Sequence, residues 1–151
     1  MSNTVVFAGD GGKISIEVFG YERPAAPHPG GDTWDANWLD AKLLAEAGPF
    51  RGTFRLALTT PELAGLYRDL EKATGSLSGR VSFKSLEEDL ELTISYSERG
   101  AAEIAGVLRP GGLSPGVLHF QFQSDQSYLS SSVQELRILI QRFPFRNVPG
   151  L

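Results

Sequence analysis

Hydrophobic and polar positions change their period within the stretch from Leu118 to Phe143. Leu118, Phe120 and Phe122 alternate with polar residues, which is the pattern of a strand with one buried face. After Asp125 the apolar residues recur at steps of three and four, the spacing of one stripe on a helix. That stripe comprises Tyr128, Leu129, Val133, Leu136, Ile140 and Phe143. The stretch therefore predicts a strand that runs into an amphipathic helix, with Asp125 as the N-cap.

The same alternation predicts further strands before and between two helices. The first two form a hairpin around Gly9–Gly12, where Asp and Gly supply the positive backbone φ angles of a tight turn. The expected strands cover Val5–Ala8, Ile14–Phe19, part of Asp32–Glu46, Thr53–Thr59, Leu77–Phe83, Leu90–Tyr96 and Ala101–Leu108. The first helix has Thr60 as its N-cap, Pro61 at its first position and Gly75 as a left-handed C-cap. Its buried stripe comprises Leu63, Leu66, Tyr67 and Leu70.

Four strands and a helix therefore occur twice, in residues 1–75 and 76–143. The strands before the two helices, Gly52-Thr-Phe-Arg-Leu-Ala-Leu and Gly116-Val-Leu-His-Phe-Gln-Phe, share a pattern but little residue identity. Strands joined by short turns form antiparallel meanders. We expect one globular α+β domain, 1–151, with about eight antiparallel strands in one or two twisted sheets and two helices on their apolar faces. The second helix has the wider stripe, and we expect it to be the more deeply buried.

Composition limits the class of protein. The 151 residues are 41% hydrophobic and 21% charged, and they include no cysteine, which excludes disulfides and thiolate metal sites. The start lacks the pattern of a secretory signal, and no apolar run is long enough to span a bilayer. A net charge of -4 argues against a nucleic-acid partner. We expect a soluble cytoplasmic protein without membrane contacts; nothing indicates its oligomeric state.

The most distinctive stretch contains Trp34, Asp35, Asn37 and Trp38. In one interpretation the two indole rings cover the end of the core, and the polar side chains bond to nearby backbone amides. In a second, this end of the sheet forms a ligand pocket. A third places a hard cation on the carboxylates, but the spacing lacks the glycine and terminal glutamate of a calcium loop. The structural interpretation is favoured, and no metal or cofactor is expected.

The sequence contains no arrangement typical of catalysis. His28 lies in a proline-rich loop, and His119 lies on the outward face of its strand among polar residues. Adjacent carboxylates at Glu87 and Glu88 have no apolar surroundings that would raise a pKa. The sequence therefore predicts a protein that is not an enzyme.

Four carboxylates gather in the turn and strand start formed by Glu87, Glu88, Asp89 and Glu91. Such a local negative field could meet a basic partner. The alternative is a solvated hairpin that only aids solubility. These residues are the candidate partner-binding surface.

A resemblance adds a function class. Its segments, in chain order, are Asp32-Thr-Trp-Asp-Ala-Asn-Trp-Leu, Gly52-Thr-Phe-Arg, Thr60-Pro-Glu-Leu, Leu77-Ser-Gly with Phe83, Leu90-Glu-Leu-Thr-Ile and Asp125-Gln-Ser-Tyr-Leu. This series resembles the WapI-type immunity family of small bacterial proteins. The resemblance implies a non-catalytic binding protein that neutralises a cognate protein toxin, and it brings no catalytic residues. The alternative is a small-ligand-binding or assembly module.

Overall fold

The computed structural model describes residues 2–23, 35–111 and 116–147. The strands are β1 (Thr4–Gly9), β2 (Gly12–Tyr21), β3 (Trp38–Ala47), β4 (Phe50–Thr59), β5 (Arg80–Lys84), β6 (Leu90–Tyr96), β7 (Ala101–Leu108) and β8 (Leu118–Asp125). The helices are α1 (Thr60–Ser76) and α2 (Gln126–Arg142), and short 3-10 turns occupy Asp35–Asn37 (η1) and Glu98–Gly100 (η2).

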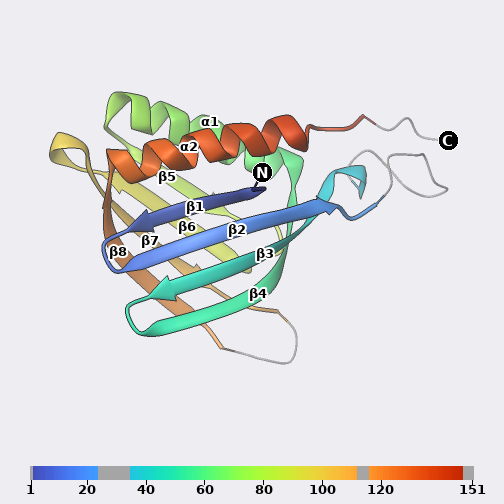
Figure 1. Ribbon diagram of the computed structural model, residues 1–151, viewed down its shortest axis with the longest axis horizontal. Helices are drawn as coiled ribbons and strands as arrows, with labels where there is room; N and C mark the ends of the chain where they lie inside the picture. The colour runs from blue at the N-terminus through green and yellow to red at the C-terminus, as the bar shows by residue number, and fades with distance from the viewer. Residues whose placement is uncertain (1, 24–34, 112–115, 148–151) are drawn as a thin grey trace.

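The strands form two antiparallel sheets, in the orders β1-β2-β3-β4 and β5-β6-β7-β8. Each sheet is a meander of consecutive strands, because short turns join neighbours without a crossover. Each meander leads directly into a helix, and the two helices lie side by side along one end of the sheets (Figure 1). The predicted α+β fold, with eight antiparallel strands and two helices, is confirmed.

The two halves repeat each other in position as well as in order. Thr59 and Asp125, the last residues of β4 and β8, cap α1 and α2, and each helix has 17 residues. The helices bury residues at matching distances from their caps, such as Leu63 with Leu129 and Leu70 with Leu136.

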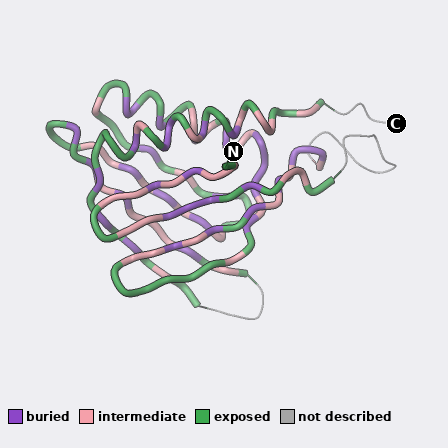
Figure 2. Tube along the Cα trace, in the orientation of Figure 1, coloured by how far each residue is buried: buried purple, intermediate pink, exposed green. Residues whose placement is uncertain are grey.

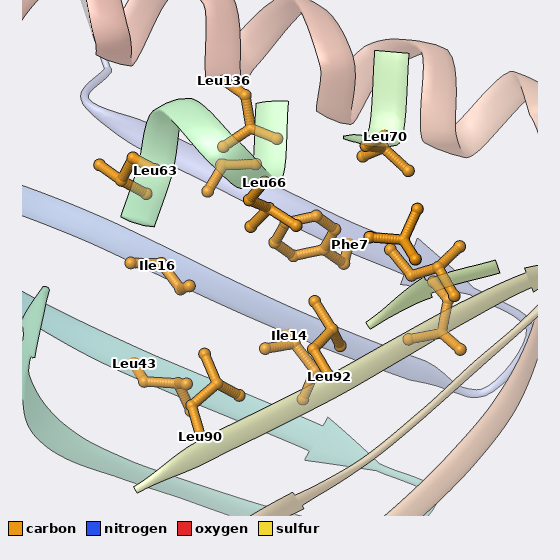
Figure 3. Packing of buried hydrophobic residues seen from close by; sticks show 14 of the residues in the cluster. Phe7, Ile14, Ile16, Leu43, Leu63, Leu66, Leu70, Leu90, Leu92 and Leu136 are labelled. Carbon is orange, nitrogen blue, oxygen red and sulfur yellow. The ribbon is translucent and has the colours of Figure 1, made fainter. Parts of the chain in front are cut away.

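One contiguous core draws on both sheets and both helices. Burial alternates along the strands, as Figure 2 shows, because each sheet turns one face inward and one face to solvent. Figure 3 shows Phe7 and Ile14 of the first sheet, Leu92 of the second, Leu66 of α1 and Leu136 of α2 converging on this interior. All five are at most 2% exposed. The halves therefore share their core.

Several helix predictions are wrong in detail. The N-cap of α1 is Thr59, because its hydroxyl, not that of Thr60, accepts from the Glu62 amide. The C-cap of α1 is Leu77, a left-handed residue with φ of 52°, whereas Gly75 lies inside the last turn. β5 consequently begins later than expected, at Arg80.

The expected difference in helix burial is also wrong. Tyr128, expected in the buried stripe of α2, lies in the first turn of the helix and is 41% exposed. Both helices bury a similar set of residues, since each packs beside the other and beside one sheet.

Each helix packs beside the first strand of the opposite half, α2 beside β1 and α1 beside β5. α2 also supplies hydrogen bonds to the outer edge of β1. The Val6 amide donates to Glu135 Oε1 at 3.0 Å, and Ser132 Oγ donates to the Val6 carbonyl at 2.5 Å. Side chains thus replace the missing neighbouring strand, whose absence would leave these backbone groups unpaired.

The β1–β2 turn packs against β8. The Asp10 amide donates to the Gln123 carbonyl at 2.7 Å. A Cβ on Gly9 would lie 2.0 Å from that carbonyl oxygen, and one on Gly12 would lie 2.2 Å from the Phe122 ring. Only Gly11 of this turn has the predicted positive φ, 74°. The other two glycines serve close packing between the sheets, which the sequence did not indicate.

We expect Ser132→Ala to lower the free energy of unfolding by about 1–2 kcal/mol, because it leaves the carbonyl of Val6 without a partner. Ser131→Ala is the matched control, since Ser131 is exposed on the same helix and shares the gain in helix propensity. Urea titrations of both variants measure the difference. Equal stability of the two variants would mean that the Ser132 bond contributes nothing.

Candidate functional site

Residues 85–89 join β5 to β6 and form the acidic turn. Hydrogen bonds of Ser85, which is 1% exposed, hold this turn in place. Its hydroxyl donates to Asp89 Oδ1 at 2.7 Å and accepts from the Leu90 amide at 3.1 Å. The Ser85 amide donates to the Leu90 carbonyl, and the Ser85 carbonyl accepts from the Glu88 amide. These bonds fix the backbone of the turn, so its side chains project from a defined platform.

Glu62 ties this turn to the first half of the chain. One carboxylate oxygen accepts from the amide and hydroxyl of Thr59, at 2.7 and 2.9 Å. The other oxygen accepts from the Leu86 amide at 2.8 Å. A single carboxylate therefore completes the capping box of α1 and anchors the tip of the β5–β6 turn.

The four predicted carboxylates have different surroundings. Glu88 lies 3.4 Å from Lys84 Nζ, and Asp89 accepts from Ser85. Glu91 is hydrogen-bonded by the Arg109 guanidinium, which holds the pKa of that carboxyl below its usual range. Among the residues that the structure describes, Glu87 has neither a hydrogen bond nor an ion pair. The turn therefore brings these residues together but leaves Glu87 as its uncompensated charge.

An exposed apolar side chain lies beside this charge. Leu86, at the tip of the turn, is 53% exposed, and the neighbouring Glu87 and Glu88 are exposed too. An apolar anchor with a charged rim is the usual composition of a protein contact site. Sequence reasoning missed Leu86, because nothing in the local pattern distinguishes an exposed leucine at a turn from a buried one.

The turn also borders a hollow of about 310 Å³ between the end of the second sheet and β4. Its charged lining residues are Glu22, Asp40, Arg55, Glu87, Asp89 and Arg109. Asp40 lies 3.4 Å from Arg55, so that pair is mutually compensated. The carboxylates outnumber the guanidiniums, which extends the acidic character of the turn across the gap between the sheets.

In the tryptophan stretch, Ala36 and Asn37 of η1 are buried, and the Asn37 side chain is fully enclosed. Its side-chain amide donates to the Arg146 carbonyl at 2.8 Å, and its oxygen accepts from the Arg146 amide at 2.7 Å and from the Thr60 hydroxyl at 3.2 Å. Asp35 and Trp38 are half-buried, and Trp34 lies outside the described residues. Asn37 therefore binds the backbone of the segment that follows α2. That the tryptophan stretch forms a ligand pocket, or that its indole rings cover the end of the core, stays a prediction.

Arg146 completes this contact. Its guanidinium lies 3.6 Å from the centre of the Tyr21 ring and donates to the carbonyls of Ala36 and Arg23. The Tyr21 hydroxyl donates to the Pro144 carbonyl at 2.5 Å, and burial raises the pKa of Tyr21 against the opposing effect of Arg146. The sequence contains no local signal for this contact, because its partners are more than a hundred residues apart.

The residues considered for other chemistry do not come together. His119 is exposed on the outer face of β8, and His28 lies outside the described residues. Within residues 2–23, 35–111 and 116–147, no three histidine, aspartate or glutamate side chains are arranged so that they could hold one metal ion. Neither helix of this part is long and apolar enough to cross a membrane.

The model of the immunity protein WapI-like family matches residues 5–144, which is most of the chain. The chain belongs to this family, and the resemblance noted in the sequence is confirmed. No curated protein matches it.

We expect Glu62→Ala to lower the free energy of unfolding by about 1–2 kcal/mol and to speed hydrogen exchange at the Leu86 amide. Thr59→Ala is the control, because it damages the same helix cap but leaves the second Glu62 oxygen on Leu86. Exchange measured by NMR should rise at Leu86 in the first variant more than in the second. An equal rise in both would show that Glu62 does not anchor the turn.

We expect Asn37→Ala to cost about 2–3 kcal/mol, because it leaves a buried cavity and breaks the bonds to the Arg146 backbone. Arg146→Ala keeps those backbone bonds and should cost less. Thermal melts compare the two, and carboxypeptidase trimming reports release of the C-terminal segment. A larger loss for Arg146→Ala would assign the contact to the guanidinium instead.

Proposed function

We propose that this chain is an immunity protein that neutralises a cognate protein toxin by covering it, without catalysis, in the cytoplasm. Membership of the WapI-like immunity protein family supports the toxin partner. The observation that carries the proposed surface is the rigid β5–β6 turn, which presents exposed Leu86 beside the uncompensated Glu87.

Rigidity favours binding at this turn. Ser85 and Glu62 fix its backbone in the free protein, so little conformational entropy is lost when a partner binds. Leu86 would enter an apolar depression on the toxin, and water excluded around it would strengthen the surrounding charge contacts.

The charge of the surface indicates the chemistry of the toxin. Glu87 together with the acidic lining of the neighbouring hollow favours a basic surface, such as a cleft that binds nucleic acid. Complementary charge accelerates association, which matters for an inhibitor that must act before its target does. Covering such a cleft blocks the substrate, and no reactive group of the inhibitor is needed.

We expect Leu86→Ala combined with Glu87→Lys to slow association with the cognate toxin domain by about tenfold, and to speed its dissociation. The salt dependence of the association rate should weaken as well. Stopped-flow binding at two ionic strengths measures both effects.

Glu98→Lys is the matched control, because Glu98 is an exposed carboxylate at the η2 turn and its reversal changes net charge equally. It should leave the kinetics nearly unchanged. If the control slows association as much as the double variant, the effect comes from net charge and the turn is not the interface. If the toxin does not bind the unaltered protein, the proposed function itself is wrong.

A further inference from the structure

The start of β4 presents an open strand edge in the described part of the chain. α2 lies along β1, α1 lies along β5, and the β1–β2 turn bonds to β8 at Gln123. Within the described parts of the chain, only β3 pairs with β4. Its first residues, Phe50 to Thr53, are all exposed. The backbone groups on this side are therefore available to another strand.

The side chains of this edge alternate sharply in character. Arg51 and Arg55 point outward, with side chains 70% and 67% exposed, and each pairs with a carboxylate of β3 behind it, Glu46 at 3.5 Å and Asp40 at 3.4 Å. Phe50 and Phe54 lie on the opposite face with Gly52 between them, and Phe50 is 67% exposed. A Cβ placed on Gly52 would meet nothing within 4 Å. On one face, the outermost row of side chains is therefore cationic with its carboxylate partners one strand further in, and the other face is apolar with open space at its centre.

A hollow of about 350 Å³ lies against the cationic face, lined by Phe19, Lys42, Thr53, Phe54 and Arg55. The Arg55 guanidinium is held 4.6 Å from the centre of the Phe19 ring. The combination suits a glutamate side chain, whose methylene groups can contact the Phe19 ring while its carboxylate reaches the cations.

A second copy of this chain is a poor occupant of the edge. Antiparallel pairing about a two-fold axis places outward residues opposite outward residues. With Thr53 on the axis, Arg51 lies opposite Arg55, and neighbouring registers place arginine diagonal to arginine. Like charges at these positions destabilise strand pairing. The edge therefore favours a different strand of opposite charge.

We propose that β4 is a docking edge for an extended segment of another protein in which glutamate alternates with small apolar residues. The segment adds a fifth strand to the first sheet through backbone hydrogen bonds. Its carboxylates face Arg51 and Arg55, and an apolar side chain covers Gly52 between the two phenyl rings. Arg55 also lines the hollow beside the β5–β6 turn, but the proposal rests on the free strand edge and does not depend on the proposed function.

The competing explanation is that the arginines only prevent pairing, since charged residues commonly protect sheet edges from aggregation. The two explanations differ in one respect. A protective edge rejects every strand, whereas a docking edge accepts an acidic one and rejects a basic one.

Fluorescence anisotropy with labelled peptides distinguishes a docking edge from a protective edge. The probes are a short peptide alternating glutamate and valine, its lysine counterpart, and two forms N-methylated at either the glutamates or the valines. We expect the glutamate peptide to bind, the lysine peptide not to bind, and one N-methylated form to lose binding while the other keeps it. Failure of the glutamate peptide to bind, or equal binding by both N-methylated forms, overturns the proposal.

Variants of β4 test whether Arg51 and Arg55 bind the peptide. Replacing Arg51 and Arg55 by glutamine should weaken binding of the glutamate peptide about tenfold. Arg68 and Lys72, exposed cations of α1, give the control when both are replaced by glutamine, and binding should not change. Thermal melts check that each variant is folded, and Arg51→Gln alone serves if the double variant is not. Unchanged binding in a folded Arg51 variant overturns the proposal.

Discussion

A four-stranded sheet leaves an apolar face and two hydrogen-bonding edges in water, and neither half of this chain covers its own. At β1 and β5 the halves solve this by exchange. α2 lies along β1 and α1 lies along β5, so each helix completes the sheet of the other half. Ser132 and Glu135 act as substitutes for a neighbouring strand by bonding both backbone groups of Val6. The shared core follows from this arrangement, because burying one sheet requires the helix of the other.

The same exchange explains where contact surfaces remain. Near the β1–β2 turn, Gly9 and Gly12 allow β8 to approach closely, and a backbone bond joins Asp10 to Gln123. The corresponding place in the second half, beside the β5–β6 turn, instead keeps a hollow lined by charged side chains. The contact between the β1–β2 turn and β8 is therefore closely packed, whereas a hollow separates the acidic turn between β5 and β6 from β4.

Charge pairing then decides which residues of that turn are available. Lys84, Arg109 and Ser85 engage Glu88, Glu91 and Asp89, so these carboxylates contribute mainly to the order of the turn. Glu87 and Leu86 remain directed at solvent. The sequence shows four carboxylates that look equivalent. In the described part of the structure they belong to an ordered turn in which Glu87 is the one unpaired charge and Leu86 is the exposed apolar side chain.

The sequence by itself determined the elements and their order. Alternation in stretches such as Leu90–Tyr96 and the three-and-four spacing after Asp125 are local properties, imposed by the geometry of strands and helices whatever lies around them. The α+β class followed, because strands joined by short turns pair with their neighbours.

Only the tertiary structure decided what those elements touch. The bond from Glu62 to Leu86, the bonds between Asn37 and Arg146, and the pairing of Arg109 with Glu91 join residues distant in the sequence. No periodicity encodes such partners, because they depend on how the two sheets are placed against each other. The helix ends were misjudged for the same reason: the ranking of Thr59 over Thr60 and of Leu77 over Gly75 depends on backbone angles that the surrounding packing sets.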